Sequence, residues 1–373
     1  MTVEELKRAF VYAYQQKADA VYFVPGHICL IGEHVLCNND SDITSALSVG
    51  IYLLLRKNNE KCIKFWSLNE PEAINWNINQ PIPKNINSWL KYPIGIFKKF
   101  INDKYDLDCG YDTLFWGNMP KGTELLPSEG LEIITAFALK DQICKYQSST
   151  QNPQIRNHSL SYINLNIIPV ELVSEITETL YARAEGYKVV ISNTYIPHKV
   201  DVSPYLQRIT ESKLAFEYLN KIRPVYDWDG LTEDEFKTMV STIENPVAIK
   251  AAYHAISEVY RTKQAIKAIK ENDLKRFGQL MYDSHISLRD NLEIVSPEVD
   301  AIVSEALKID GVLGSRMAGC GFGGCTISLV KEEAVDTFIK KVGRIYEEET
   351  GIKNHFFIAE IGDCACKLHQ QYI

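Results

Sequence analysis

The chain has 373 residues, of which 46% are hydrophobic and 24% are charged, and this composition excludes a disordered or low-complexity protein. Forty Lys and Arg residues against 48 Asp and Glu residues give a formal net charge of -8, which leaves no overall positive field to hold a nucleic acid. No apolar run approaches the ~20 residues of a membrane-spanning helix, and Glu4 and Glu5 stand where a signal peptide would be apolar. We therefore expect a folded cytoplasmic protein that has neither a nucleic acid nor a membrane as partner.

The nine cysteines are an odd number spread along the whole chain, which favours free thiols over a disulfide framework. Cys364 and Cys366 form the closest pair, with one residue fewer between them than in the CxxC spacing of zinc sites. We expect no structural metal.

The first part of the chain is predicted to form a helix and then several strands. Residues 1–16 carry Leu6, Phe10 and Tyr14 at helical spacing. Residues 117–130 are rich in Gly, Pro and small polar residues, and we expect a loop there that leads into a helix over Leu131–Ile143. Short apolar runs predict strands, the first two joined by a turn at Pro25-Gly26, over Val21–Val24, Ile28–Ile31, Ile51–Leu55 and Cys62–Leu68.

The second half is predicted to be mainly helical. A helix with Ser296 as N-cap and Pro297 in its first turn is expected to bury Val299, Ile302, Val303, Ala306 and Leu307. We place a domain boundary after residue 186, giving domains of residues 1–186 and 187–373. The other predicted elements are a strand over Tyr187–Ser192, helices over Ala251–Ile269 and Asp273–Ser287, a glycine-rich turn at 318–324 and a strand over Thr326–Val330.

Three segments carry residues suited to chemistry. The first is VPGHICLIGEH at residues 24–34, in which Glu33 and His34 follow an apolar strand. A charged pair at the end of a buried strand is a common placement for a polar ligand site. By themselves these residues also fit a surface turn with a salt-bridged glutamate.

The second segment is GNMPKGTELLPSEGLEIITAFAL at residues 117–139, a loop before a helix whose amides could receive phosphate. Gly117 and Gly122 have the glycine spacing of a Walker A motif, but Thr123 and Glu124 replace its Lys and Ser/Thr, so a plain structural junction is the alternative. The third segment, LGSRMAGCGFGGCTISLV at residues 313–330, has five glycines between Gly314 and Gly324. Such density indicates a backbone that approaches another group closely.

In order and spacing the three segments resemble the three motifs of the GHMP small-molecule kinases and, among them, the galactokinases. PGHICLIGEH is similar to the first motif, in which an Arg follows Pro-Gly, and GSRMAGCGFGGCT is similar to the third. The resemblance extends over nearly the whole chain through SPYLQR at 203–208, Ala252-Tyr253-His254 with Glu258, and LRDNLEIVSPEVD at 288–300. The chain is identified by this resemblance as a divergent galactokinase-like protein.

The resemblance implies an α+β fold of two domains, an N-terminal α/β domain and a C-terminal α+β domain with a cleft between them. It implies a monomeric transferase of galactose metabolism that moves the γ-phosphoryl of ATP, with Mg²⁺, to the anomeric hydroxyl of galactose. Matched position by position, the implied sugar-binding residues are Glu33, His34 and Tyr205. The implied nucleotide- and phosphate-binding residues are Gly122, Ser128 (which is also a weak Mg²⁺ ligand), Gly319, Gly321, Gly323 and Gly324.

Several positions depart from the family pattern. His27 stands where the family has the Arg of the first motif, and an imidazole is mostly neutral at pH 7 and lacks the five-donor guanidinium fork. Leu36 replaces an Asp that binds sugar hydroxyls in the family. In the second motif Pro127 removes a backbone donor, while Glu124 and Glu129 bring negative charge towards the phosphate position.

The catalytic base of the family is also missing. Between Leu139 and Gly186 no Gly-x-Met-Asp-Gln segment supplies the Asp beside the acceptor hydroxyl, and Asp141-Gln142 comes too early in the chain to replace it. Two functions therefore compete: a sugar kinase of galactokinase type with weakened activity, and a non-catalytic descendant that binds a sugar, a metabolite or a protein partner.

Overall fold

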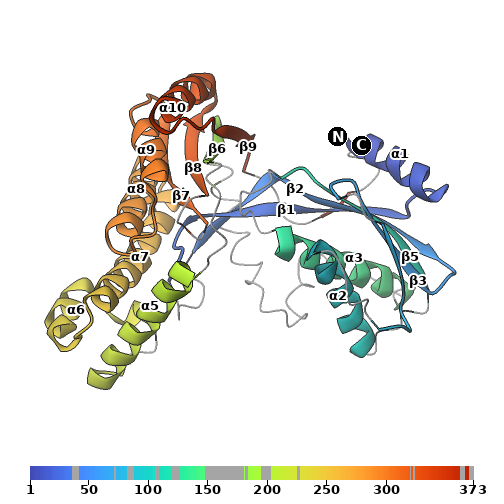
Figure 1. Cartoon of the computed structure of the whole chain (residues 1–373), viewed down its shortest axis with the longest axis horizontal. Coiled ribbons are helices and arrows are strands. Elements are labelled where there is room, and N and C mark those ends of the chain that lie inside the picture. Colours follow the sequence, from blue (N-terminus) through green and yellow to red (C-terminus); the bar gives the residue numbers. More distant parts are fainter. Residues whose placement is uncertain are drawn as a thin grey trace.

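The computed structural model describes residues 1–35, 42–70, 73–81, 88–103, 105, 107, 109–119, 127–147, 180, 184–194, 203–224, 227–319, 321, 324–361 and 366–368 (Figure 1). These residues form an α+β fold with two sheets, as the sequence predicts. In Figure 1 the N-terminal elements lie on the right, the helices α5 to α10 lie on the left, and the long strands β1 and β2 run between the two groups.

The N-terminal sheet has six strands in the order β10-β1-β2-β5-β3-β4, and only β3 and β5 run parallel. Helices α2 and α3 pack on one face around Leu53, Phe97 and Ile134, while α1 covers the other face with Leu6 and Phe10. The elements are α1 Val3–Tyr14, β1 Ala20–Ile31, β2 Ile43–Asn58, β3 Cys62–Ser67, β4 Ile74–Asn77, η1 Ser88–Leu90, α2 Lys91–Asn102, β5 Gly110–Gly117, α3 Pro127–Gln147 and β10 Cys366–Lys367.

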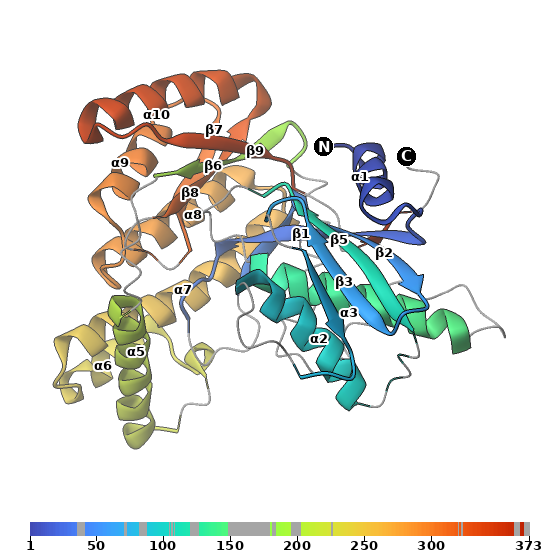
Figure 2. The ribbon, with the colours of Figure 1, turned by 45° about the vertical axis from the view of Figure 1, so that its right-hand side comes forward.

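The C-terminal sheet is antiparallel, in the order β7-β8-β6-β9. Helices α9 and α10 pack on one face around Val190 and Phe338, and α7 and α8 pack on the other around Ile327 and Phe277 (Figure 2). Helices α5 and α6 join α7 around Trp228. The elements are β6 Tyr187–Asn193, α5 Ser203–Ile222, η2 Trp228–Gly230, α6 Glu233–Met239, η3 Val240–Thr242, α7 Pro246–Lys270, α8 Leu274–Asp290, α9 Pro297–Ala306, β7 Val312–Ala318, β8 Cys325–Lys331, η4 Glu332–Ala334, α10 Val335–Thr350 and β9 His355–Ala359.

Strand β1 belongs to both halves of the molecule. Its first part places Tyr22 and Val24 in the core under α2 and α3, and its second part places Ile28 and Leu30 in the core between the C-terminal sheet and the helices α7 and α8. A strand advances about 3.3 Å per residue, so twelve residues are long enough to reach from one core to the other. The residues that follow β1 therefore lie in the C-terminal half.

The predicted Pro25-Gly26 turn is wrong, because β1 runs through both residues as one strand. The pairing of β1 with β2 shifts register between Pro25 and His27. Proline lacks a backbone N–H, and within a strand it is tolerated at an irregularity of this kind.

Most predicted elements are confirmed, with changes at their ends. Helix α3 begins at Pro127, four residues earlier than expected, because proline suits the first position of a helix. Ser296 caps α9 as predicted, but Leu307 is the C-cap of that helix and is only partly buried. The division after residue 186 stays a prediction.

Two further expectations can be compared with the described residues. Of the cysteines that the structure describes, Cys29 and Cys62 are free thiols, as the sequence predicts. Among the helices that the structure describes, none combines the length and the apolar character needed to cross a bilayer.

Candidate functional site

The turn that carries Glu33 and His34 has an unusual backbone. Gly32 has φ +103° and His34 has φ +65°, and both values lie in the left-handed region. A non-glycine residue there is uncommon and persists where its surroundings hold it. We call residues 32–34 the GEH turn.

Residues from the third motif hold the GEH turn from one side. The guanidinium of Arg316, which is fully buried on β7, donates from Nη2 to Oε2 of Glu33 at 2.8 Å and from Nη1 to the carbonyl of Cys29 at 3.2 Å. The ring of His34 donates from Nε2 to the carbonyl of Gly319 at 3.1 Å. Glu33 therefore forms a salt bridge, as the interpretation of this segment as a surface turn expects. Its partner, however, is a buried residue 283 positions away in sequence.

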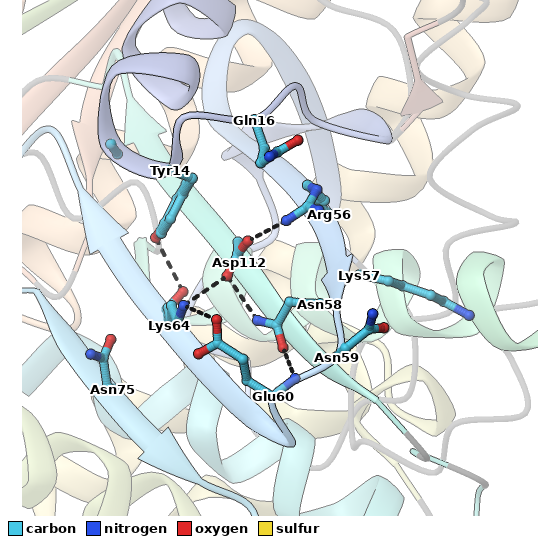
Figure 3. Close-up of a pocket in the computed structure, with 11 residues that line it drawn as sticks. Tyr14, Gln16, Arg56, Lys57, Asn58, Asn59, Glu60, Lys64, Asn75 and Asp112 are labelled. Atoms are coloured by element: carbon cyan, nitrogen blue, oxygen red, sulfur yellow. Dashed lines mark hydrogen bonds and ion pairs between the residues drawn. The ribbon is translucent and has the colours of Figure 1, made fainter.

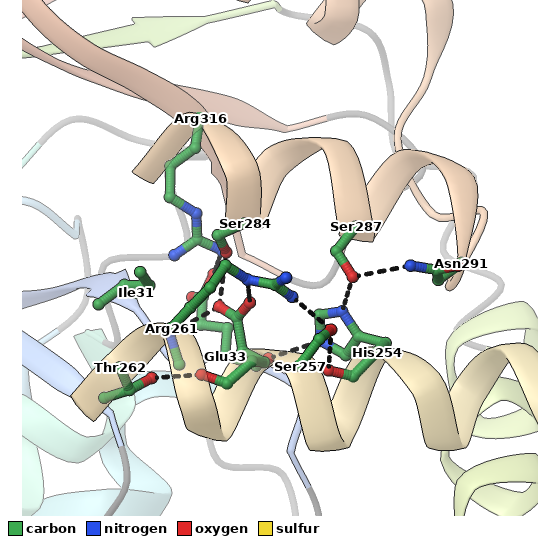
Figure 4. A network of polar contacts seen from close by, with 12 residues as sticks. Ile31, Glu33, His254, Ser257, Arg261, Thr262, Ser284, Ser287, Asn291 and Arg316 are labelled. Carbon is green, nitrogen blue, oxygen red and sulfur yellow. Dashed lines mark hydrogen bonds and ion pairs between the residues drawn. The ribbon is translucent and has the colours of Figure 1, made fainter. Parts of the chain in front are cut away.

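Helices α7 and α8 hold the turn from the other side (Figure 4). The N–H of Gly32 donates to Oε1 of Glu258 at 2.9 Å, and Nε2 of His254 lies 3.2 Å from the carbonyl of Glu33. Since that carbonyl only accepts, Nε2 carries the proton, and Nδ1 accepts from the hydroxyl of Ser287 at 2.9 Å.

The charges of this network balance, with Arg316 and Glu258 fully buried and Glu33 and Arg261 partly buried. Arg316 and Arg261 face Glu33 and Glu258, with Nε of Arg261 2.7 Å from Oε2 of Glu258. Burial by itself would raise the pKa of Glu258, but the charges of Arg261, His254 and Arg316 lower it to about 2. Burial raises the pKa of Glu33 to about 6, against the charge of Arg316. Glu33 therefore titrates closer to neutrality than an ordinary carboxyl.

Three glycines of the third motif have a backbone conformation that only glycine adopts easily. Gly319, Gly321 and Gly324 have φ between +80° and +87°. A Cβ on Gly321 would lie 2.6 Å from the carbonyl oxygen of Ile294. Gly314, in contrast, packs in β7 against Gly278 of α8, so its lack of a side chain is explained by helix–strand packing.

His27 lies on β1, opposite Ala46 of β2. Burial lowers the pKa of its imidazole, so the ring is neutral at pH 7. It forms no hydrogen bond or ion pair with the described residues. The position where the resemblance expects a guanidinium therefore carries no permanent positive charge.

Other predicted site residues are placed only in part. Ser128 lies in the first turn of α3 and Tyr205 in the first turn of α5, and the positions of their side chains are not described. Gly122, Gly323 and Leu36 lie outside the described residues.

The side chain of Asp141 forms its hydrogen bonds in the N-terminal half of the molecule. Its Oδ2 accepts from the hydroxyl of Tyr22 at 2.7 Å and from Nζ of Lys367 at 2.6 Å. Tyr22 lies on the first part of β1, whereas the GEH turn follows the end of that strand. Burial and Asp141 together raise the pKa of Tyr22, so its phenol is neutral and donates a hydrogen bond to Asp141.

Sequence reasoning missed several residues that organise this site. Arg316 was not singled out, although a lone arginine inside an otherwise apolar or small-residue strand is a detectable signal. Ser284 and Ser287 on α8 gave no signal, because serine is common on helices. Glu258 and His254 entered only through the family resemblance.

A polar pocket of about 610 Å³ lies elsewhere, at the end of α1 (Figure 3). At its floor Asp112 of β5 accepts from Arg56 at 3.0 Å and from Asn58 at 2.7 Å. Arg56 stands near the end of β2, whereas Ile43 at the start of β2 pairs with Ile31 beside the GEH turn. The pocket and the GEH turn are therefore at opposite ends of the same strand.

Comparison with known proteins first identifies the fold. Residues 265–348 match the domain family described as GHMP kinases C terminal. A mevalonate kinase structure aligns with a TM-score of 0.58 over 92% of this chain and 99% of its own, at 18% identity. The fold is that of a GHMP kinase.

Closer similarity singles out one branch of that fold. A galactokinase of Clostridium beijerinckii is 34% identical over 385 residues, covering 98% of this chain and 99% of its own length. A crystal structure of Lactococcus lactis galactokinase complexed with galactose aligns with a TM-score of 0.81 and 27% identity, covering 99% of this chain and all of the other. The chain belongs to the galactokinase family.

Proposed function

We propose that this protein binds a galactose-type sugar at the GEH turn and transfers phosphoryl from ATP to its anomeric hydroxyl with weak activity. The observation that carries the proposal is the combination of a rigidly held GEH turn with a neutral His27. The turn offers a carboxylate and an imidazole, and such groups hold sugar hydroxyls. His27 offers no permanent charge to a phosphate.

The sugar side of the site is supported by the contacts of the GEH turn. Arg316 holds the side chain of Glu33 and the carbonyl of Gly319 holds that of His34, so both side chains are ordered before a ligand arrives. Preorganised groups lose little entropy on binding. Tyr205 is proposed as a third sugar contact by its family position.

The nucleotide side fits ATP less well. Phosphoryl transfer depends mainly on positioning and on neutralising charge, which Mg²⁺ supplies together with protein cations. We propose Gly122, Ser128, Gly319, Gly321, Gly323 and Gly324 as the phosphate-binding positions, with Ser128 towards Mg²⁺. Because the imidazole of His27 is neutral, the site lacks the preorganised positive charge that the family Arg would supply. Losing one such group typically lowers the rate by ~10²–10³.

A second candidate is a non-catalytic descendant that binds the sugar and does not turn over. It is favoured by the engagement of Asp141 with Tyr22 and Lys367, which leaves that carboxylate committed away from the GEH turn. Losing a general base removes a further ~10²–10⁴ in rate. We propose a small sugar and ATP as ligands for the first candidate and the sugar alone for the second; a monomeric, cytoplasmic protein stays a prediction in both.

One pair of measurements tests the proposal. Purified protein is incubated with Mg-ATP and galactose while ³¹P NMR follows the formation of a sugar 1-phosphate, and calorimetry measures galactose binding. Slow product formation with galactose binding supports a weak kinase, and binding without product supports the non-catalytic descendant. Turnover within about tenfold of ordinary small-molecule kinases, ~10 s⁻¹, contradicts the weakened activity. Absence of galactose binding contradicts both candidates.

A further inference from the structure

The amide of Gly32 needs an acceptor that β1 does not supply. Gly32 is buried and follows the last residue of the strand, Ile31, so no strand carbonyl receives its N–H. A buried N–H without a partner is costly and rare. The acceptor is the Oε1 atom of Glu258, 226 residues away in sequence.

The Glu258 carboxylate is itself fixed in orientation. It is fully buried on α7. The hydroxyl of Ser284 on α8 donates to Oε1 at 2.5 Å, and Nε of Arg261 donates to Oε2 at 2.7 Å. Arg261 is held in turn by a second contact from its Nη2 to the hydroxyl of Ser257 at 2.9 Å. Both oxygens are therefore committed, and the carboxylate cannot rotate without breaking a contact.

These contacts bear directly on the strained part of the turn. His34, two residues after Gly32, has φ +65°. Because it is not a glycine, this left-handed backbone is strained. Glu258 fixes the backbone at Gly32, and His254 fixes the carbonyl of Glu33 from the same helix. The turn is thus clamped immediately before the left-handed residue.

We propose that Glu258 is a positioning residue for sugar binding, which holds the amide of Gly32 and so fixes the backbone from which Glu33 and His34 meet the ligand. The inference rests on the proposed function, because it takes the ligand of the turn to be a sugar. Glu258 itself touches no substrate; it acts through the turn.

The variant Glu258→Gln tests this role with little change of volume. The amide NH₂ of glutamine would face either Nε of Arg261 or the N–H of Gly32, so one donor must meet another. The matched control is Asp112→Asn, which neutralises another buried carboxylate, at the far end of β2, where Arg56 and Asn58 hold it. Ser284→Ala is the milder second variant, because it removes one contact to Oε1 and leaves the charge.

Two measurements are made on each protein. Hydrogen–deuterium exchange reports the opening of the Gly32 amide, and calorimetry gives the galactose dissociation constant. For Glu258→Gln we expect both the exchange rate and the dissociation constant to rise by about tenfold, the size expected for one charge-assisted hydrogen bond. Ser284→Ala shifts both in the same direction by about threefold, as fits one neutral hydrogen bond. Asp112→Asn leaves both unchanged.

The outcomes separate the positioning role from the proposed function. If Glu258→Gln does not fold, Ser284→Ala decides, and unchanged exchange and affinity in it overturn the proposal. Equal losses of galactose affinity in Glu258→Gln and Asp112→Asn also overturn it, because they reflect general destabilisation. If the wild-type chain binds no galactose, the proposed function is overturned, and with it the sugar-binding half of the inference. The exchange rate of the Gly32 amide still tests whether Glu258 holds the backbone of the GEH turn.

Discussion

Replacing Arg316 by Met would leave Glu33, which is largely buried, without its counter-charge. Burial has already raised the pKa of Glu33 from 4.5 to about 6, so the variant can respond by keeping the proton at pH 7. That response limits the additional electrostatic cost to about 1.4 kcal/mol, the value of one further pKa unit. The carbonyl of Cys29 also loses its donor, which costs about 1–3 kcal/mol. We expect Arg316→Met to lower the free energy of unfolding by about 2–4 kcal/mol at pH 7.

The pH dependence of this effect follows from the sign of the Glu33 shift. A carboxyl whose pKa is higher in the folded state contributes stability that is present below pH 4.5 and is lost as pH rises through 6. Without Arg316 the loss continues towards pH 7, so the difference between variant and wild type is about 1.4 kcal/mol smaller at pH 5 than at pH 7. Urea unfolding followed by tryptophan fluorescence at both pH values measures it.

The matched control is Arg344→Met, which removes an exposed ion pair with Glu348 on α10. Such pairs contribute at most about 0.5 kcal/mol. If Arg316→Met and Arg344→Met destabilise the protein equally at both pH values, the reasoning about the buried network is wrong. A double variant, Arg316→Met with Glu33→Gln, should recover part of the loss because no uncompensated charge is left.

Three further predictions concern other parts of the molecule. His27→Arg alone should leave phosphoryl transfer, followed by ³¹P NMR, no faster than in the wild type, because the sequence offers no counterpart of the family base; a recovered rate would show that another carboxylate serves. Burial lowers the pKa of His254 from 6.5 to about 4, so the unfolded chain binds more protons in this window and wild-type stability falls as pH falls from 6.5 to 4, by up to about 3 kcal/mol. His254→Asn should flatten this dependence in urea titrations, and an unchanged slope would contradict the assignment. Gly278→Ala would place a Cβ 2.0 Å from the carbonyl of Leu313 and should lower the free energy of unfolding by about 1–3 kcal/mol. Gly95→Ala, where the Cβ meets open space, should leave the stability unchanged or raise it. Equal unfolding midpoints for the two variants would refute the packing argument.

Elements with local signals were predictable from sequence. Ser296 and Pro297 define the start of α9 because capping and the first helical turn depend on neighbouring residues only. The Pro25-Gly26 prediction failed because the residue types that favour a turn act locally, whereas the continuation of β1 is decided by its pairing with β2. Local sequence propensity therefore predicts the wrong structure where residues distant in sequence supply the hydrogen bonds.

The site shows the same division. Glu33 and His34 could be singled out, since a charged pair at the end of an apolar strand is visible in the sequence. Their contacts with Arg316 and Glu258 could not be predicted, because these residues come from β7 and α7, far along the chain, and only the fold brings them to the turn. The family resemblance indicated which proteins the chain is related to. The physical reason for each contact is visible only in the folded structure.

The path of β1 has a consequence for any attempt to divide this protein. A fragment ending at residue 186 would carry Ile28 and Leu30 without the helices that cover them, and it would lack the C-terminal strand that pairs with Tyr22 and Phe23. The complementary fragment would lose part of its own interior. We therefore expect neither piece to fold independently, and co-expression of the two would be required to reconstitute the whole.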